Sequence, residues 1–213
     1  HAATTAAIQQ LPGAITLAFA PYGRDLQDNV DQARAAGHEV LLQIPMEPID
    51  YPTNDPGPHT LLTTVPAREN LGRLDWLLGR FTGYVGTINY MGSRFTASAP
   101  SLRPVLIALR DRGLMFVDAR SSPASVVIPL ARDIGLPAVP NDRYIDNEAS
   151  RAAIDARLQE LERLAKAHGQ ALGVCFPYPV TIERLAQWSR GLDAKGIDLA
   201  PASALLVQEK ARG

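Results

Sequence analysis

Residues 37–47 read GHEVLLQIPME, and this stretch contains the pattern that decides the fold. A glycine ends a helical stretch, and an apolar run begins within three positions of it. Glycine after the last turn is a common helix stop signal, and a short run of Val, Leu and Ile is typical of a buried strand. The same step recurs in RDRGLMFV, AHGQALGV and AKGIDLA. A repeated step from helix to strand predicts an α/β protein.

Apolar runs separated by amphipathic stretches extend this pattern along the chain. We predict strands at residues 15–20, 39–46, 84–91, 114–119, 171–177 and 198–207, with a weaker one near residue 138. We predict helices at residues 24–37, 67–81, 99–113, 122–135, 148–169 and 181–196. The strands are almost continuously apolar, as in a parallel sheet covered by helices. One strand and one helix recur every ~30 to 40 residues, which fits a parallel barrel or a doubly wound sheet, and we favour the barrel.

The length and composition indicate one globular domain spanning residues 1–213, which we favour, or two very small domains. Hydrophobic residues make up 46% of the chain and charged residues 20%, which excludes a disordered protein. Lys and Arg total 21 and Asp and Glu total 22, so the basic excess that nucleic acid binding needs is absent. No apolar run approaches the roughly 20 residues that span a bilayer. The single cysteine, Cys175, cannot form an internal disulfide, and any export signal is expected upstream of His1.

Polar side chains gather where the predicted strands end. In a parallel sheet these ends form one edge, and active sites lie along that edge. Gln43, Asn89 and Asp118 lie in the last turns of three strands, where a purely structural strand would carry Val or Ile. Further candidates lie at or beyond the strand ends, namely Glu47, His59, Tyr90, Arg94, Arg120 and Tyr178. Because side chains alternate along a strand, Gln43 and Glu47 are expected on the same face.

Several of these residues have a structural interpretation as well. Glu47 is also placed to cap a backbone group or to pair with Arg94 or Arg120. Asp118 and Arg120, two positions apart, are placed to form an ion pair at the edge of the sheet. Trp76, in RLDWLLGRF, falls on the apolar stripe of its predicted helix and is assigned to the core.

Five phrases along the chain resemble, in order and spacing, the divergent polysaccharide deacetylases. They are LAFAPYGRDL, GHEVLLQIPMEP, FTGYVGTINYMGSRFT, GLMFVDARSS and GVCFPYPVTIERL, and the resemblance covers about residues 5 to 207. These proteins are bacterial envelope relatives of the metal-dependent sugar N-deacetylases. The resemblance implies an irregular (β/α) barrel, an envelope glycan or amino-sugar oligosaccharide as partner, and a periplasmic or membrane-tethered location facing the periplasm.

The resemblance also implies where a metal site would lie. Active relatives hold the ion with an aspartate at the end of the first strand and with two histidines spaced H-x-x-x-H after the GHE phrase. In this chain Gln43 and Glu47 occupy those two positions, and Tyr90 and Phe176 replace further histidines of the family. We therefore assign no metal ligand and expect no tightly bound cofactor, although oxygen donors would suit a weakly bound hard ion. The chain starts with a helix-like segment, so the first strand either lies upstream or is absent from the domain.

Two classes of function follow. The first is a hydrolase that removes the acetyl group of an amino-sugar glycan, with Glu47 and Asp118 as catalytic candidates. Substrate binding would then fall to Gln43, His59, Asn89, Tyr90, Arg94, Arg120 and Tyr178. The second is a non-catalytic module that binds a glycan or a protein on the same barrel, since a fold alone does not carry chemistry.

Overall fold

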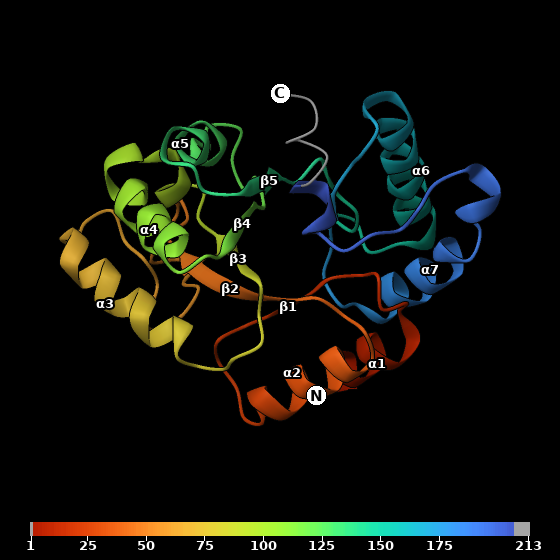
Figure 1. Cartoon of the computed structure of the whole chain (residues 1–213), viewed down its shortest axis with the longest axis horizontal. Coiled ribbons are helices and arrows are strands. Elements are labelled where there is room, and N and C mark those ends of the chain that lie inside the picture. The colour runs from red at the N-terminus through yellow and green to blue at the C-terminus, as the bar shows by residue number, and fades with distance from the viewer. Residues whose placement is uncertain (1, 207–213) are drawn as a thin grey trace. The chain divides into compact units, whose positions relative to one another are not determined.

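The largest sheet has five strands in the order β1-β2-β3-β4-β5 (Figure 1). The structure is a computed structural model that describes residues 2–206. The strands are β1 (Leu17–Phe19), β2 (Val40–Met46), β3 (Gly86–Met91), β4 (Met115–Asp118) and β5 (Ala138–Pro140). The pairs β2–β3, β3–β4 and β4–β5 are parallel. A second sheet pairs β6 (Arg143–Tyr144) with β7 (Gly173–Val174), also in parallel.

Helices alternate with these strands along the chain. They are α1 (Ala2–Gln10), α2 (Leu26–Ala35), α3 (Ala67–Leu78), α4 (Ala99–Asp111), α5 (Val127–Ile134), α6 (Arg151–His168) and α7 (Pro179–Ser189), with short 3-10 turns η1 (Phe95–Ala97) and η2 (Asp193–Lys195). A doubly wound sheet reverses its strand order at a switch point, whereas this order is sequential. The predicted α/β fold is confirmed, and the order of strands and helices is consistent with the barrel-like arrangement that the resemblance implies.

Contacts divide the chain into two compact units. Unit 1 comprises the described parts of residues 1–17, 31–39 and 141–213, and unit 2 comprises residues 18–30 and 40–140. The prediction that residues 1–213 form one domain stays a prediction. In the part of the chain that the structure describes, none of the helices combines the length and apolar character needed to span a bilayer.

In unit 2, helices α3, α4 and α5 lie side by side along the sheet (Figure 1). Each turns an apolar stripe inward, and α4 alone buries Leu102, Val105, Leu106 and Leu109. Across the sheet, Leu42 and Phe116 are fully buried. Burying such side chains contributes roughly 1.5–3 kcal/mol each, so this sheet with its helices forms a substantial core.

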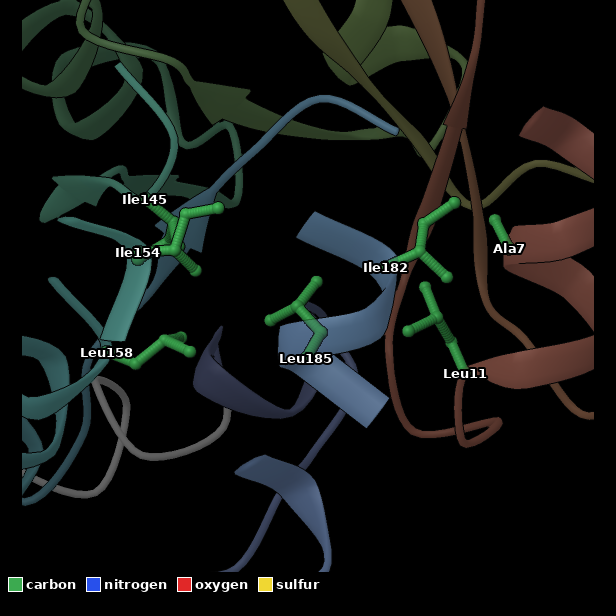
Figure 2. Close-up of a cluster of buried hydrophobic side chains, with 7 residues drawn as sticks. All are labelled: Ala7, Leu11, Ile145, Ile154, Leu158, Ile182 and Leu185. Carbon is green, nitrogen blue, oxygen red and sulfur yellow. The ribbon is translucent and has the colours of Figure 1, made fainter. Parts of the chain in front are cut away.

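In unit 1, a buried cluster joins α1, α6 and α7 (Figure 2). Its members are Ala7, Leu11, Ile145, Ile154, Leu158, Ile182 and Leu185. The polar flank of α6 is bound to α7 by a two-pronged ion pair, in which Arg184 contacts both carboxylate oxygens of Asp155 at 2.7 and 2.8 Å. Such bidentate pairs are the strong form of a surface salt bridge.

His38 joins α1 to the chain that leads into β2. Its Nδ1 lies 2.8 Å from the carbonyl oxygen of Ile15 and its Nε2 lies 3.4 Å from that of Ile8, and the residue is buried. The Ile8 carbonyl belongs to the last turn of α1, where carbonyls lack helical partners. His38 is therefore a structural hydrogen-bonding residue.

Three expectations about secondary structure and burial differ from the structure. Residues 198–206 form no strand, and residues 204–206 are helical, while Val207 lies outside the described residues. Glu39 accepts hydrogen bonds from the backbone and hydroxyl of Ser203, and such capping favours a helix start. Strand β6 was not predicted. Trp76 is 38% exposed, so the core assignment is wrong, because Leu74 and Leu77 form the buried stripe of α3.

Candidate functional site

The predicted site residues of β2, β3 and β4 divide between the two faces of the sheet. Partners in a parallel ladder share a face, and successive residues alternate. Gln43 pairs with Ile88 and Tyr90 pairs with Pro45, so Gln43 and Tyr90 share one face. Asn89 pairs with Ile44 on the other face. Continuing the β3–β4 register by one residue from Ile88 and Val117 places Asp118 on the same face as Asn89.

Asn89 fixes the loop that follows β4. Its amide nitrogen donates to the carbonyl of Met91 at 2.8 Å, and its amide oxygen accepts from the backbone N–H of Ala119 at 2.8 Å. The same amide nitrogen lies 3.3 Å from the hydroxyl of Ser121. The side chain therefore joins the ends of two adjacent strands. A valine at this position, as in an ordinary strand, could not make these bonds.

Asp118 has a similar position and a similar set of bonds. It is 1% exposed, and its carboxylate accepts from the backbone N–H of Arg120 and from the hydroxyl of Ser125, each at 2.8 Å. Burial raises the pKa of Asp118 above its ordinary value, and these two hydrogen bonds and the charge of Arg120 offset only part of that effect. Its contact with Arg120 is made by the backbone of that residue, and its catalytic role stays a prediction.

Glu47 lies one residue beyond β2 and is 2% exposed. One carboxylate oxygen accepts from both the backbone N–H and the hydroxyl of Thr63, at 2.6 and 2.7 Å. The other oxygen lies 3.5 Å from the guanidinium of Arg94. That guanidinium also donates to the carbonyl of Ile49 at 2.7 Å. Glu47 and Arg94 thus brace the loop between β2 and α3, and the structural interpretation of Glu47 as Arg94's partner is confirmed.

His59 lies in the same loop and stacks on Trp76 of α3. The two rings are parallel within 2° and their centroids are 3.6 Å apart. The Arg80 guanidinium carbon lies 4.8 Å from the centroid of the Trp76 ring, and the Tyr22 hydroxyl accepts from the His59 backbone N–H at 3.2 Å. Because its ring already contacts His59 and Arg80, Trp76 is poorly placed to stack on a ligand.

Two further predicted residues are exposed. Arg120 follows β4 with a left-handed backbone (φ 51°), and its side chain is exposed. Tyr178 belongs to unit 1, immediately before α7, and is 46% exposed. Its ring lies 6.0 Å from that of Phe176, at an interplanar angle of 46°. Unit 2 therefore contains the other predicted residues, and unit 1 contains an exposed aromatic pair.

Asp146 is a strand-end carboxylate that the sequence analysis missed. It lies two residues beyond β6 and is 5% exposed. One of its oxygens accepts from the backbone N–H of Phe176 at 2.8 Å and from the hydroxyl of Thr181 at 2.9 Å. Burial raises its pKa above the ordinary value, and these hydrogen bonds lower it by less. The signal in the sequence was RYID, in which Tyr144 and Ile145 precede an acid, but β6 is only two residues long.

Cys175 adjoins this carboxylate and is expected to be chemically inert. Burial, followed by the charge of Asp146, raises the pKa of the Cys175 thiol to about 12. At pH 8 only about one thiol in ten thousand would then be ionised, and the thiolate is the reactive form. We expect negligible labelling of the native protein by a thiol reagent such as DTNB, and one label per chain after unfolding in urea. Rapid labelling of the native protein would contradict this.

The donor atoms around the family's metal positions do not fit a tightly held transition metal. The Gln43 side-chain amide donates to the Ala18 carbonyl at 3.3 Å, and the Glu47 carboxylate contacts Thr63 and Arg94. Among residues 2–206 there is no group of three or more His, Cys, Asp or Glu side chains arranged to hold a metal ion. Zinc sites in proteins use three or four such ligands, most often imidazole or thiolate.

Comparison with known proteins agrees with the fold. Residues 1–206 match the family described as divergent polysaccharide deacetylase. An uncharacterized protein of Agrobacterium tumefaciens C58, ATU2773, has a crystal structure that is similar with a TM-score of 0.94 and 40% identity, over 96% of this chain and 83% of that one.

Two curated relatives are also uncharacterized proteins. One is from Haemophilus influenzae Rd, 25% identical over 90% of this chain, and the other is YibQ of Escherichia coli K12, 26% identical over 92%. The chain spans 68% and 60% of their respective lengths. The family match covers all the residues that the structure describes. The chain belongs to the divergent polysaccharide deacetylase family.

Proposed function

We propose that this chain is a glycan-recognising domain of the bacterial envelope that keeps the deacetylase fold without metal-dependent hydrolysis. The observation that carries the proposal is the state of the two family metal positions. Gln43 offers a neutral amide, and the Glu47 carboxylate is buried and bonded to Thr63 and Arg94. A metal at this site would have to displace those partners and leave the Arg94 charge without its carboxylate.

The hydrolase alternative needs a carboxylate that can reach a substrate. Its two candidates, Glu47 and Asp118, are 2% and 1% exposed and accept hydrogen bonds from their own loops. A general base has to lie within hydrogen-bond reach of the proton that it abstracts. The exposed aromatic pair of unit 1, in contrast, presents ring surface directly to solvent. Binding without hydrolysis therefore accounts for more of the geometry.

The proposal includes a location on the periplasmic side of the envelope. The resemblance to envelope proteins supports this location. The glycan present on that side of the envelope is built of N-acetylated amino sugars. The ligand class is accordingly an oligosaccharide of N-acetylglucosamine type.

Two measurements on the purified protein test this function. We expect isothermal titration calorimetry to detect binding of chitotetraose, and we expect no acetate release from the same sugar with added Zn²⁺, Co²⁺ or Mg²⁺. Elemental analysis of protein purified without added metal should give far less than one zinc per chain. Metal-dependent acetate release would show that the chain is a hydrolase, and one tightly held zinc per chain would contradict the proposed loss of the metal site.

A further inference from the structure

The segment Phe176–Pro177–Tyr178–Pro179 is exposed over all four residues and begins two residues after the end of β7. Phe176 is 39% exposed and Tyr178 is 46% exposed. Their ring centroids are 6.0 Å apart and the rings are tilted by 46°. Large aromatic side chains that remain exposed as a pair often mark a binding surface.

The backbone that carries the two rings is fixed. Buried Asp146 accepts the Phe176 N–H at 2.8 Å, and the Tyr178 N–H donates to the Phe176 carbonyl at 2.9 Å. The Tyr178 carbonyl in turn accepts from the N–H of Ile182 in α7 at 2.9 Å. Two prolines further restrict the backbone dihedrals. Because the backbone that carries the rings is fixed before binding, a ligand would have to order only the side-chain torsions of the two rings.

Polar side chains lie at the same end of this two-stranded sheet. Tyr144 pairs with Val174, and the Ile145 N–H donates to the Val174 carbonyl at 2.9 Å. The residues that follow β6 therefore leave the sheet at the same edge as those that follow β7. Among them, Asn147 and Glu148 are exposed. The edge combines aromatic faces with an amide and a carboxylate.

We propose that Phe176 and Tyr178 form the stacking platform for a pyranose ring of the glycan. This inference rests on the proposed function and names the residues at which the glycan would bind. A pyranose has an apolar face of C–H groups and a polar rim of hydroxyls, which matches ring surface at the same sheet edge as the exposed Asn147 and Glu148. A stable protein interface buries about 800 Å² on each partner, which is far more than two partly exposed rings supply. A sugar therefore suits the platform better than a protein partner.

The test is chitotetraose binding by calorimetry to the whole chain and three variants. We expect F176A/Y178A to bind at least about tenfold more weakly, because loss of both rings removes stacking worth about 1.4 kcal/mol or more. Y178F keeps the ring and should bind within about threefold of the parent protein. I49A removes another exposed side chain, in unit 2, and should leave the affinity unchanged.

The outcomes separate this inference from the proposed function. If the parent protein binds and F176A/Y178A binds equally well, the platform is wrong while the proposed function stands. If the parent protein does not bind chitotetraose, the proposed function fails and the platform with it. Equal thermal midpoints for the parent and F176A/Y178A would establish that weaker binding is not a folding defect. In two-dimensional NMR spectra, addition of the sugar to the parent protein should shift the resonances of residues 146–148 and 176–178.

Discussion

Replacing Gly86 by alanine is expected to destabilise the protein by about 3 kcal/mol. Gly86 is buried in β3, between Leu41 of β2 and Met115 of β4. A Cβ at this position would lie 2.3 Å from Met115 Cγ and 2.5 Å from the Met115 carbonyl oxygen. Because the carbonyl belongs to the backbone of β4, the strand itself would have to move. Thermal unfolding should show a midpoint lower by about 6–12 °C.

Gly72 provides the matched control for this substitution. It lies within α3, and an added Cβ would meet nothing within 4 Å. Alanine has a better helix propensity than glycine by about 1 kcal/mol, so G72A should be neutral or slightly stabilising. The same chemical change is thus expected to have opposite signs at the two sites. A G86A protein as stable as the parent would mean that β3 and β4 are packed less tightly than described.

The helix-to-strand steps explain why much of the fold was predictable from sequence. Glycines such as Gly113 and Gly169 adopt left-handed backbones, with φ of 71° and 83°, at the junctions that the sequence marked. The apolar run of residues 39–46 became β2 because its length and composition fit a buried strand. Residues 198–206 have a similar composition, but capping of Ser203 by Glu39, distant in sequence, favours a helix there. Such tertiary contacts are not visible in a local pattern.

The candidate site was less predictable, because strand ends alone do not determine side-chain direction. Gln43 and Asn89 lie within neighbouring strands of one sheet, yet their registers place them on opposite faces. Register depends on pairing between strands, and a one-residue shift reverses every side chain. Polar residues near strand ends therefore include both residues that fix loops and residues that are exposed to solvent. Some, such as Asn89 and Asp118, fix loops. Tyr178, in contrast, belongs to the exposed aromatic pair beyond β7, which lies within the strand predicted at residues 171–177, whereas its two-residue partner β6 was not predicted.

Replacing Glu47 by alanine is the second change with a large expected effect. It removes the partner of the Thr63 N–H and hydroxyl and leaves the Arg94 guanidinium without its carboxylate. The Thr63 donors are partly buried, and a donor that loses its partner away from water costs about 1–3 kcal/mol, with hydrogen bonds to a charged group at the upper end. We expect E47A to lose about 2–4 kcal/mol of unfolding free energy in urea, with faster amide exchange in the loop of residues 47–63.

A double-mutant cycle with T63V measures how much of this loss comes from the Thr63 hydroxyl. The valine keeps the shape of Thr63 and its backbone N–H but removes the hydroxyl that lies 2.7 Å from Glu47. We expect a coupling energy of about 1 kcal/mol, because the two side chains are in direct contact.

The variant E47Q separates the structural role of Glu47 from a catalytic role, since glutamine keeps an acceptor for Thr63 but has no basic carboxylate. If E47Q abolished acetate release while both E47Q and E47A kept parental stability, Glu47 would be a base rather than a brace of this loop.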